Sequence, residues 1–292
     1  MSTLARTDRM WEEAMPSTTA ADSVTRMADL TTPTWNTALV TGASRGIGEA
    51  FARELAQRRS NLVVVARDAE RLKHLAAELE AAHAVSVEVL AADLVEPDDR
   101  GAVEARLSDS RRPVDLLVNN AGFGTTGAFD KLPVEREDEE IQLNVTALVR
   151  LTHAVLPQMI ERGSGTVLNV SSVAGIVASP GSATYCATKS FVNTFTDSLH
   201  EELRGSGVTV TAVLPGFTRT DFQDTASYDA ERSIPGFAWL SADDVARAAL
   251  AGAAAGRARV VPGLYKFVVG AAGPVPPGIL RRFVAEMSKR FG

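Results

Sequence analysis

Cysteine is almost missing from this chain of 292 residues, which contains Cys186 alone. A single cysteine excludes an internal disulfide framework and a cysteine metal cluster, and it fits a reducing compartment, so we expect a cytoplasmic protein. Histidine is also scarce, because the four histidines are widely separated and lack the spacing of metal ligands. No metal site is predicted.

Long apolar runs and basic clusters are missing as well. The sequence has no run of apolar residues long enough to span a bilayer, so no transmembrane helix is expected. A net charge of −6 and the lack of a Lys/Arg block argue against nucleic acid as a partner. Residues 1–35 lack the apolar core of a secretion signal. We interpret them as a poorly ordered extension, within which Met27 is an alternative start.

Short apolar runs alternate with longer helical patterns from Thr37 onward. Strands are expected at 38–40, 62–65, 85–91, 114–118, 166–170, 208–214 and 259–261. Helices are expected between them, at 47–58, 69–82, 97–107, 137–161, 182–204 and 242–255. Continuous Val/Leu strands separated by helices predict a single α/β domain over 36–262. Its architecture would be a doubly wound parallel sheet, a Rossmann fold, with helices on both faces.

Two segments interrupt this alternation. Residues 217–240 contain Pro, Gly, Asp and Ser and are predicted to form a substrate lid. The lid carries five aromatic residues: Phe217, Phe222, Tyr228, Phe237 and Trp239. They fit an apolar substrate, and packing within the lid explains them equally well. Residues 263–292 are predicted as a linker, Gly/Pro-rich over 270–278, followed by an amphipathic helix over 279–291 that packs on its own domain, a partner subunit or a membrane surface.

The first expected strand leads into a glycine-rich turn at 41–48, which precedes a helix. Glycines allow a tight turn and a close approach of the backbone to a pyrophosphate, and the helix N-terminus offers free N–H groups to that anion. The turn therefore predicts a dinucleotide site. Its expected contacts are Gly42, Ser44, Arg45, Gly46, Ile47 and Gly48.

The end of the second strand bears on the choice of dinucleotide. An NAD site places an acid on the adenosine ribose about here, but Ala66 stands at the expected position and Arg67 follows it. Two guanidinium groups, of Arg45 and Arg67, suit a 2′-phosphate, which favours NADP over NAD. Asp68 leaves an alternative open, because a carboxylate there can bind a 2′-hydroxyl, although its place before a helix suits an N-cap.

Tyr185 and Lys189 lie four residues apart in the helix expected at 182–204. They should project from the same face of that helix. A cation beside a phenol lowers its pKa, which turns it into a useful acid or base. The pair by itself is weak evidence, since most pairs of this kind are ordinary surface neighbours.

Together these motifs resemble the short-chain dehydrogenase/reductase superfamily, over about residues 36–261. The family's Asn-Asn-Ala-Gly motif matches 119–122, its adenine-binding aspartate matches Asp93, and its Pro-Gly pair after the sixth strand matches Pro215-Gly216. The resemblance implies cofactor contacts beyond the glycine turn. They are Arg67, Asp93, Leu94, Asn120, Ala121, Gly122, Tyr185, Lys189, Pro215, Gly216, Thr218 and Thr220.

The same resemblance implies a catalytic tetrad of Asn144, Ser172, Tyr185 and Lys189. Tyr185 would transfer a proton, Lys189 would lower the phenol pKa and hold the nicotinamide ribose, and Ser172 would bind the substrate oxygen. Asn144 would hold a water that relays the proton to solvent. The family offset from the tyrosine selects Ser172, and Ser171 is interpreted as a strand-end residue bonded to backbone.

The implied activity is that of an NADP(H)-dependent oxidoreductase, which interconverts a carbonyl and a secondary alcohol on an apolar small molecule. The family also implies a homodimer or homotetramer built on the two long helices. Two alternatives remain open: a non-catalytic NADP-binding regulator of the same fold, and a membrane-surface reductase of lipids or steroids that uses the C-terminal helix.

Overall fold

The computed structural model describes residues 34–220 and 236–272. All of them belong to one compact unit that begins at Thr34. Residues 1–33, most of the predicted lid (221–235) and the predicted C-terminal helix (279–291) lie outside the described residues. Within the described ranges, no helix has the length and apolarity needed to cross a membrane.

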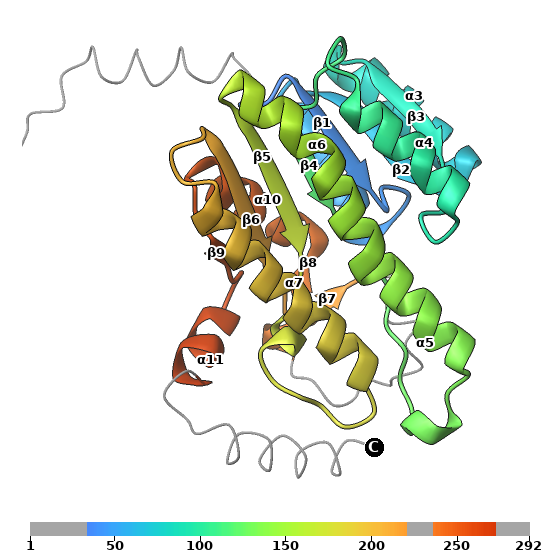
Figure 1. The fold of residues 1–292 in the computed structure, drawn as a ribbon, viewed down its shortest axis with the longest axis vertical. Coiled ribbons are helices and arrows are strands. Elements are labelled where there is room, and N and C mark those ends of the chain that lie inside the picture. The colour runs from blue at the N-terminus through green and yellow to red at the C-terminus, as the bar shows by residue number, and fades with distance from the viewer. Residues whose placement is uncertain (1–33, 221–235, 273–292) are drawn as a thin grey trace, which may run out of the picture. The chain divides into compact units, whose positions relative to one another are not determined.

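Seven parallel strands form one sheet, in the order β3-β2-β1-β4-β5-β6-β9 (Figure 1). They are β1 (Thr37–Thr41), β2 (Asn61–Ala66), β3 (Val87–Ala91), β4 (Leu116–Asn119), β5 (Gly165–Val170), β6 (Val208–Val213) and β9 (Arg259–Val260). β1 pairs with β2 on one side and with β4 on the other, so the strand order reverses between β1 and β4. Doubly wound sheets bind ligands at the carboxyl ends of the strands beside such a reversal.

Helices cover both faces of the sheet (Figure 1). They are α2 (Gly46–Gln57), α3 (Ala69–His83), α4 (Pro97–Ser108), α5 (Val134–Ile141), α6 (Leu148–Arg162), α7 (Ala183–Glu202) and α10 (Ala242–Ala254). Neighbouring residues of β1 enter different cores: Val40 packs with Phe51 of α2, and Leu39 packs with Leu151 of α6. Burial on both faces explains the continuous Val/Leu strands, and the predicted fold class is confirmed.

The long helix expected at 137–161 differs from a continuous α-helix. α5 ends at Ile141, residues Gln142–Ala147 form a π-helical turn, and α6 begins at Leu148. Asn144 lies in the π-helical turn, where a residue with poor α-helix propensity is tolerated. α5 and the π-helical turn pack against α7, whereas α6 packs against α4.

The C-terminal part of the described chain also departs from expectation. Helix α11, Tyr265–Ala272, begins the segment that follows the predicted domain, and it includes residues 270–272 of the stretch expected to be a Gly/Pro-rich linker. Strands β7 (Thr218–Arg219) and β8 (Leu240–Ser241) pair in parallel and join the two ends of the predicted lid. Three short 3-10 helices complete the elements used below: η1 (Phe129–Lys131), η3 (Val173–Gly175) and η4 (Gly236–Ala238).

Candidate active site

The glycine turn between β1 and α2 is held between the ends of β2 and β4. The Ala43 N–H donates to the Val65 carbonyl at 3.2 Å, and the Asn120 amide donates to the Gly42 carbonyl at 3.3 Å. Gly42 has a φ of +64°, and a Cβ added at Gly48 would lie 2.1 Å from the Gly42 carbonyl oxygen. Only glycine fits at position 48, and the resulting turn presents the N-terminus of α2 to an anion.

Asn120 braces this turn from β4. Its side-chain nitrogen donates to the Thr41 carbonyl at 2.8 Å, and the N–H groups of Asn120 and Ala121 both donate to the Thr41 hydroxyl at 3.0 Å. Asn120 was predicted as a cofactor contact, and in the structure its amide nitrogen bonds the backbone of the glycine turn. Ser44 and Ile47 are half-buried at the start of α2.

The predicted ribose and adenine contacts lie in the glycine turn, which contains Arg45, and just after strands β2 and β3, where Arg67 and Asp93 stand. Arg45 and Arg67 are both exposed, and a nitrogen of the Arg67 guanidinium lies 3.7 Å from the Asp93 carboxylate. Asp68 accepts the N–H three residues further on at 3.0 Å and caps α3, which favours the capping interpretation of this residue. Leu94 is buried in the core.

The segment after β6 reaches the same edge of the sheet. The Thr218 hydroxyl donates to the Gly216 carbonyl at 3.0 Å, and Pro215 accepts the Val173 N–H at 3.0 Å, which connects the segment to η3. A Cβ at Gly46 would lie 3.2 Å from the Cβ of Thr220. The structure therefore brings the glycine turn and the Pro-Gly segment together.

Ser172, Tyr185 and Lys189 meet at the carboxyl end of β5. Ser172 hydrogen-bonds the phenol of Tyr185. The Lys189 amine donates to the Val170 carbonyl at 2.9 Å and lies 5.7 Å from the centre of the Tyr185 ring. The Ser171 hydroxyl donates to the Lys189 carbonyl at 3.0 Å, as expected for a strand-end residue bonded to backbone.

Burial changes the ionisation of both groups. It raises the pKa of Tyr185 to about 12, against a smaller lowering by the Ser172 hydrogen bond. Burial lowers the pKa of Lys189 to about 8, while the charge of Glu140 raises it. Lys189 was expected to lower the phenol pKa, whereas burial is the largest influence on Tyr185 and raises that pKa.

Asn144 is buried, and its side chain connects a loop to α7. The amide nitrogen donates to the Phe123 carbonyl at 2.8 Å and to the Thr188 hydroxyl at 3.2 Å, and the amide oxygen accepts the Phe123 N–H at 3.1 Å. A Cβ at Gly122 would lie 2.8 Å from that oxygen. Since both amide hydrogens are used, a relay water at Asn144 would have to bind one of its oxygen atoms.

Two buried carboxyl groups on α5 were not singled out by the sequence. Glu140 is 0% exposed, and one of its oxygens accepts the Thr125 N–H at 2.8 Å and the Thr125 hydroxyl at 2.9 Å. Burial raises the pKa of Glu140. Glu137 is also buried and accepts the Thr184 hydroxyl. No signal distinguishes them in the sequence, because a run with four Glu, one Asp and one Arg over 135–140 is typical of a solvated helix face.

Tyr265 of α11 was also missed. Its hydroxyl accepts the Phe217 N–H at 3.2 Å and donates to the Ala238 carbonyl at 2.9 Å, so it joins both ends of the predicted lid. A Cβ at Gly216 would lie 2.1 Å from the Tyr265 ring. The rings of Phe217 and Trp239 lie 5.8 Å apart beside it.

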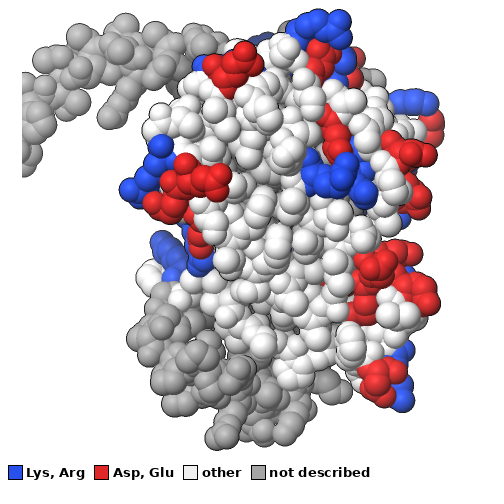
Figure 2. Space-filling view, viewed as in Figure 1, with Lys and Arg blue, Asp and Glu red and all other residues white. Residues whose placement is uncertain are grey.

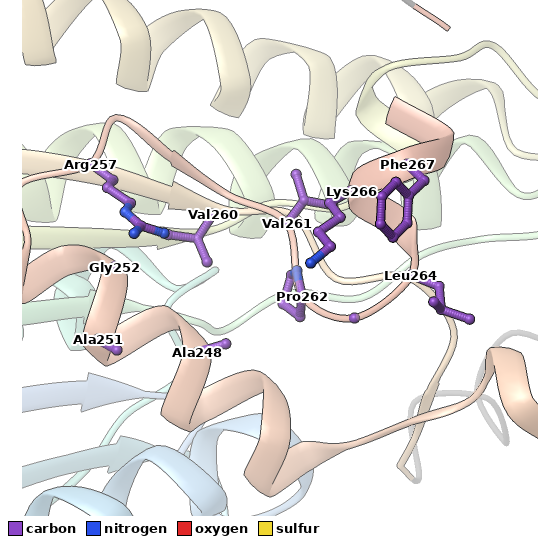
Figure 3. Close-up of a pocket in the computed structure, with 11 residues that line it drawn as sticks. Ala248, Ala251, Gly252, Arg257, Val260, Val261, Pro262, Leu264, Lys266 and Phe267 are labelled. Atoms are coloured by element: carbon purple, nitrogen blue, oxygen red, sulfur yellow. The ribbon is translucent and has the colours of Figure 1, made fainter. Parts of the chain in front are cut away.

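A surface groove of about 600 Å³ lies between α10, the edge strand β9 and the start of α11 (Figure 3). Small and apolar residues line it, together with the basic side chains of Arg257 and Lys266. None of the predicted site residues contributes to its walls. The groove is therefore separate from the candidate active site.

Comparison with known proteins identifies relatives of this arrangement. Residues 36–231 match the family model for short chain dehydrogenase. An uncharacterized oxidoreductase of Myxococcus xanthus is 40% identical over 194 residues, which cover 66% of this chain and 76% of the relative. A short-chain dehydrogenase from Sphingobium yanoikuyae, solved in complex with NADPH, aligns with a TM-score of 0.74 at 40% identity, over 80% of this chain and 92% of that structure.

A second solved relative is the bulky-bulky ketone specific alcohol dehydrogenase from Comamonas testosteroni. It aligns with a TM-score of 0.70 at 34% identity, over 82% of this chain and 95% of that structure. The family model spans most of the described fold, including the glycine turn and the segment that carries Ser172, Tyr185 and Lys189. The chain therefore belongs to the short-chain dehydrogenase family and is an oxidoreductase of that family.

Proposed function

We propose that this enzyme uses NADP(H) to interconvert a carbonyl and a secondary alcohol, with Tyr185 as the acid and base. The observation that carries the proposal is the contact of the Ser172 hydroxyl with the Tyr185 phenol, with the Lys189 amine 5.7 Å from the ring centre. Tyr185 would donate a proton to the substrate oxygen, Ser172 would give that oxygen a second hydrogen bond, and Lys189 is a buried cation beside them. Such a set serves a reaction in which charge develops on a carbonyl oxygen.

The residues at the glycine turn fit a phosphorylated dinucleotide. The N-terminus of α2 and the close-packed glycines would bind the diphosphate, and the exposed guanidinium groups of Arg45 and Arg67 would bind a 2′-phosphate. The NADPH in the solved Sphingobium relative supports this choice over NAD. When bound, the cofactor supplies the hydride. The remaining proposed contacts are Asp93, Leu94, Ala121, Gly122, Pro215, Gly216, Thr218 and Thr220, with Asn120 supporting the turn.

The ionisation of the phenol suits carbonyl reduction. With a pKa of about 12, Tyr185 is protonated at pH 7 and is able to donate to the substrate oxygen. Ser172 hydrogen-bonds the same oxygen as its negative charge grows. Lys189 would hold the nicotinamide ribose, and an oxygen of Asn144 would hold the water that returns a proton to the site. In oxidation, Tyr185 would first lose its proton to the water held at Asn144, and its phenolate would then accept the proton of the alcohol.

The proposed substrate is a bulky apolar ketone or the matching alcohol. Phe217 is 40% exposed, and the half-buried Trp239 packs against it at the base of the predicted lid, next to the Pro-Gly segment. Apolar aromatic side chains at that position favour an apolar ligand. The bulky ketones named for the Comamonas relative support the same class.

A homodimer or homotetramer is the proposed assembly. The middle of the face shown in Figure 2, over α6 and α7, is largely free of charged side chains. On α7, Phe191 is 41% exposed and its ring stacks on Phe195 at 5.7 Å. An uncharged surface with an exposed aromatic ring is typical of subunit contacts.

The test is NADPH oxidation over aliphatic, aromatic, steroid and diaryl ketones, with NADH as the cofactor control. Tyr185→Phe is expected to lower kcat by about 10³-fold, because the proton donor is lost. NADPH binding, followed by the fluorescence of the nicotinamide, should stay the same. Tight NADPH binding without turnover in the panel, unchanged by Tyr185→Phe, would instead support the non-catalytic regulator.

A further inference from the structure

The loop after β4 is fastened to two successive turns of the helix beside it. Asn144 accepts the N–H of Phe123 at 3.1 Å, and Glu140, four residues earlier, accepts the N–H of Thr125 at 2.8 Å. Residues four apart lie on one side of a helix, so the two side chains hold alternate residues of the same loop. Between those anchors lies Gly124, where an added Cβ would come within 2.8 Å of the Tyr185 ring.

Glu140 therefore acts on Tyr185 through one layer of backbone. Its two bonds to Thr125 hold the loop, and the loop lies against the face of the phenol ring. Asn144 also bonds Thr188, a neighbour of Lys189 on α7, so the same helix supports both members of the Tyr185–Lys189 pair. α5 and the π-helical turn both pack against α7 (Figure 1).

A purely structural role does not account for a carboxyl group at this place. The second oxygen of Glu140 is buried and has no hydrogen-bond partner in the part of the chain that the structure describes. Burying such an oxygen costs about 1–3 kcal/mol, and an apolar side chain would avoid that cost. The charge of Glu140 acts on Tyr185, the group assigned to proton transfer, and on Lys189, the cation beside it.

We propose that Glu140 is a positioning residue of the active site, which holds the 122–125 loop against Tyr185 and supplies the buried negative charge that balances the Lys189 ammonium. The proposal rests on the function proposed above for Tyr185 and Lys189. The titratable groups around Glu140 are Glu137 on its own helix and Tyr185, Cys186 and Lys189 on α7.

Glu140→Gln separates the two parts of this role. The amide keeps an oxygen for Thr125 and removes the charge, so the loop should stay in place. Because the charge of Glu140 raises the pKa of both Tyr185 and Lys189, the variant should lower both. Thr125→Val does the reverse, since it removes the hydroxyl contact and keeps the charge.

The ionisation of position 185 can be measured without any substrate. A fluorinated tyrosine, whose phenol ionises at a lower pH than tyrosine, is placed at position 185 of the full-length protein, and its ¹⁹F signal is titrated. Glu140→Gln is expected to shift that titration to lower pH. Glu137→Gln is the matched control: it lies one turn away, is also buried, and its charge is not among the influences on Tyr185. Its titration should match the wild type.

Turnover of a substrate found in the ketone panel gives the second readout. We expect Glu140→Gln to keep kcat within about threefold at its own optimum while the pH profile moves toward acid. Thr125→Val should lower kcat by about threefold to tenfold with the profile in place, because a small displacement of a catalytic group slows the reaction. Failure of the wild type to reduce any ketone would defeat the proposed function, yet the ¹⁹F titration would still decide the role of Glu140. An unchanged titration in Glu140→Gln, or an equal shift in Glu137→Gln, would overturn the inference.

Discussion

The glycine turn at 41–48 and the polar seam around Tyr185 both lie at the carboxyl ends of strands, but they are built in different ways. The turn relies on backbone shape and on exposed cations, since Arg45 and Arg67 face solvent. The polar seam consists of six buried or half-buried side chains: Glu137, Glu140, Asn144, Thr184, Thr188 and Lys189. Five of them bond one another or the nearby loop, and Lys189 bonds the Val170 carbonyl at the end of β5. A charged side chain therefore loses little hydration free energy at the exposed turn and much more in the buried polar seam.

This difference predicts that equal substitutions at the two places fail in different ways. A Cβ at Gly48 would lie 2.1 Å from a backbone oxygen of the turn, whereas a Cβ at Gly124 would lie 2.8 Å from the Tyr185 ring. Gly48→Ala is expected to weaken NADPH binding by about 100-fold, equivalent to about 3 kcal/mol of overpacking, because backbone has to move.

Gly124→Ala should instead lower kcat by about 100-fold and leave the Kd of NADPH within about twofold, since the ring of Tyr185 has to shift. Fluorescence titration with NADPH and steady-state kinetics on both variants measure the two effects. Equal losses of NADPH affinity in the two variants would show that the turn and the seam are a single unit, contrary to this comparison.

Burial of the Lys189 ammonium in the polar seam lowers the stability of the fold. The pKa of its amine falls from 10.5 to about 8 on folding, so the unfolded chain binds more protons between these pH values. Stability should therefore rise with pH through that window. Lys189→Met is expected to increase the free energy of unfolding by about 2 kcal/mol at pH 7, from about 1.4 kcal/mol per pH unit less the hydrogen bond to Val170.

Urea unfolding at pH 7 and pH 10 tests this expectation. The advantage of Lys189→Met should vanish and then reverse, to a loss of about 1 kcal/mol as the pH approaches 10.5, because the unfolded lysine also loses its proton there and the lost hydrogen bond to Val170 remains. A variant that is less stable than the wild type at pH 7 would show that the ammonium is well compensated in the fold.

The exposed half of the site was the more predictable from sequence. Its geometry depends on short-range constraints, namely the glycines of 41–48 placed between a strand and a helix, and on Asp68 next to the helix that it caps. Serine, tyrosine and lysine at family spacing were recognisable for a similar reason, because a loop and one helix fix their separation. The structure places Ser172, Tyr185 and Lys189 together as expected.

The buried half was predictable only in part. On α5 the pattern of burial is the inverse of what the side chains suggest: Val134 is 69% exposed and Ile141 is 42% exposed, while Glu137 and Glu140 are buried. Tertiary contacts to Thr125 and Thr184, which are distant in sequence, decide this orientation. The π-helical turn and the place of Tyr265 likewise depend on packing between distant segments, which periodicity in one segment does not reveal.

At the exposed turn, the cations should set cofactor preference without affecting the chemistry. Arg45→Ala and Arg67→Ala are each expected to weaken NADPH binding by about tenfold, or about 1.4 kcal/mol, and to leave NADH binding unchanged, because a 2′-phosphate contact is lost. The ratio of the kcat/KM values for NADPH and NADH measures the effect. Arg71, an exposed arginine one turn into α3, gives the matched control as Arg71→Ala. Loss of NADH activity in step with NADPH would assign the two cations a structural role.

Substitution of Tyr265 tests whether helix α11 influences the polar seam or only supports the base of the predicted lid. Its hydroxyl bonds Phe217 on one side of the predicted lid and Ala238 on the other, at 3.2 Å and 2.9 Å. Tyr265→Phe keeps the ring that packs on Gly216 and removes both bonds, which should cost about 1 kcal/mol in the free energy of unfolding. If the hydroxyl only joins the lid ends, KM for the ketone should rise by about threefold, while kcat and its pH profile stay as in the wild type. A fall in kcat with unchanged KM would place Tyr265 with the groups that align Tyr185. Helix α11 would then belong to the buried half of the site, together with the polar seam.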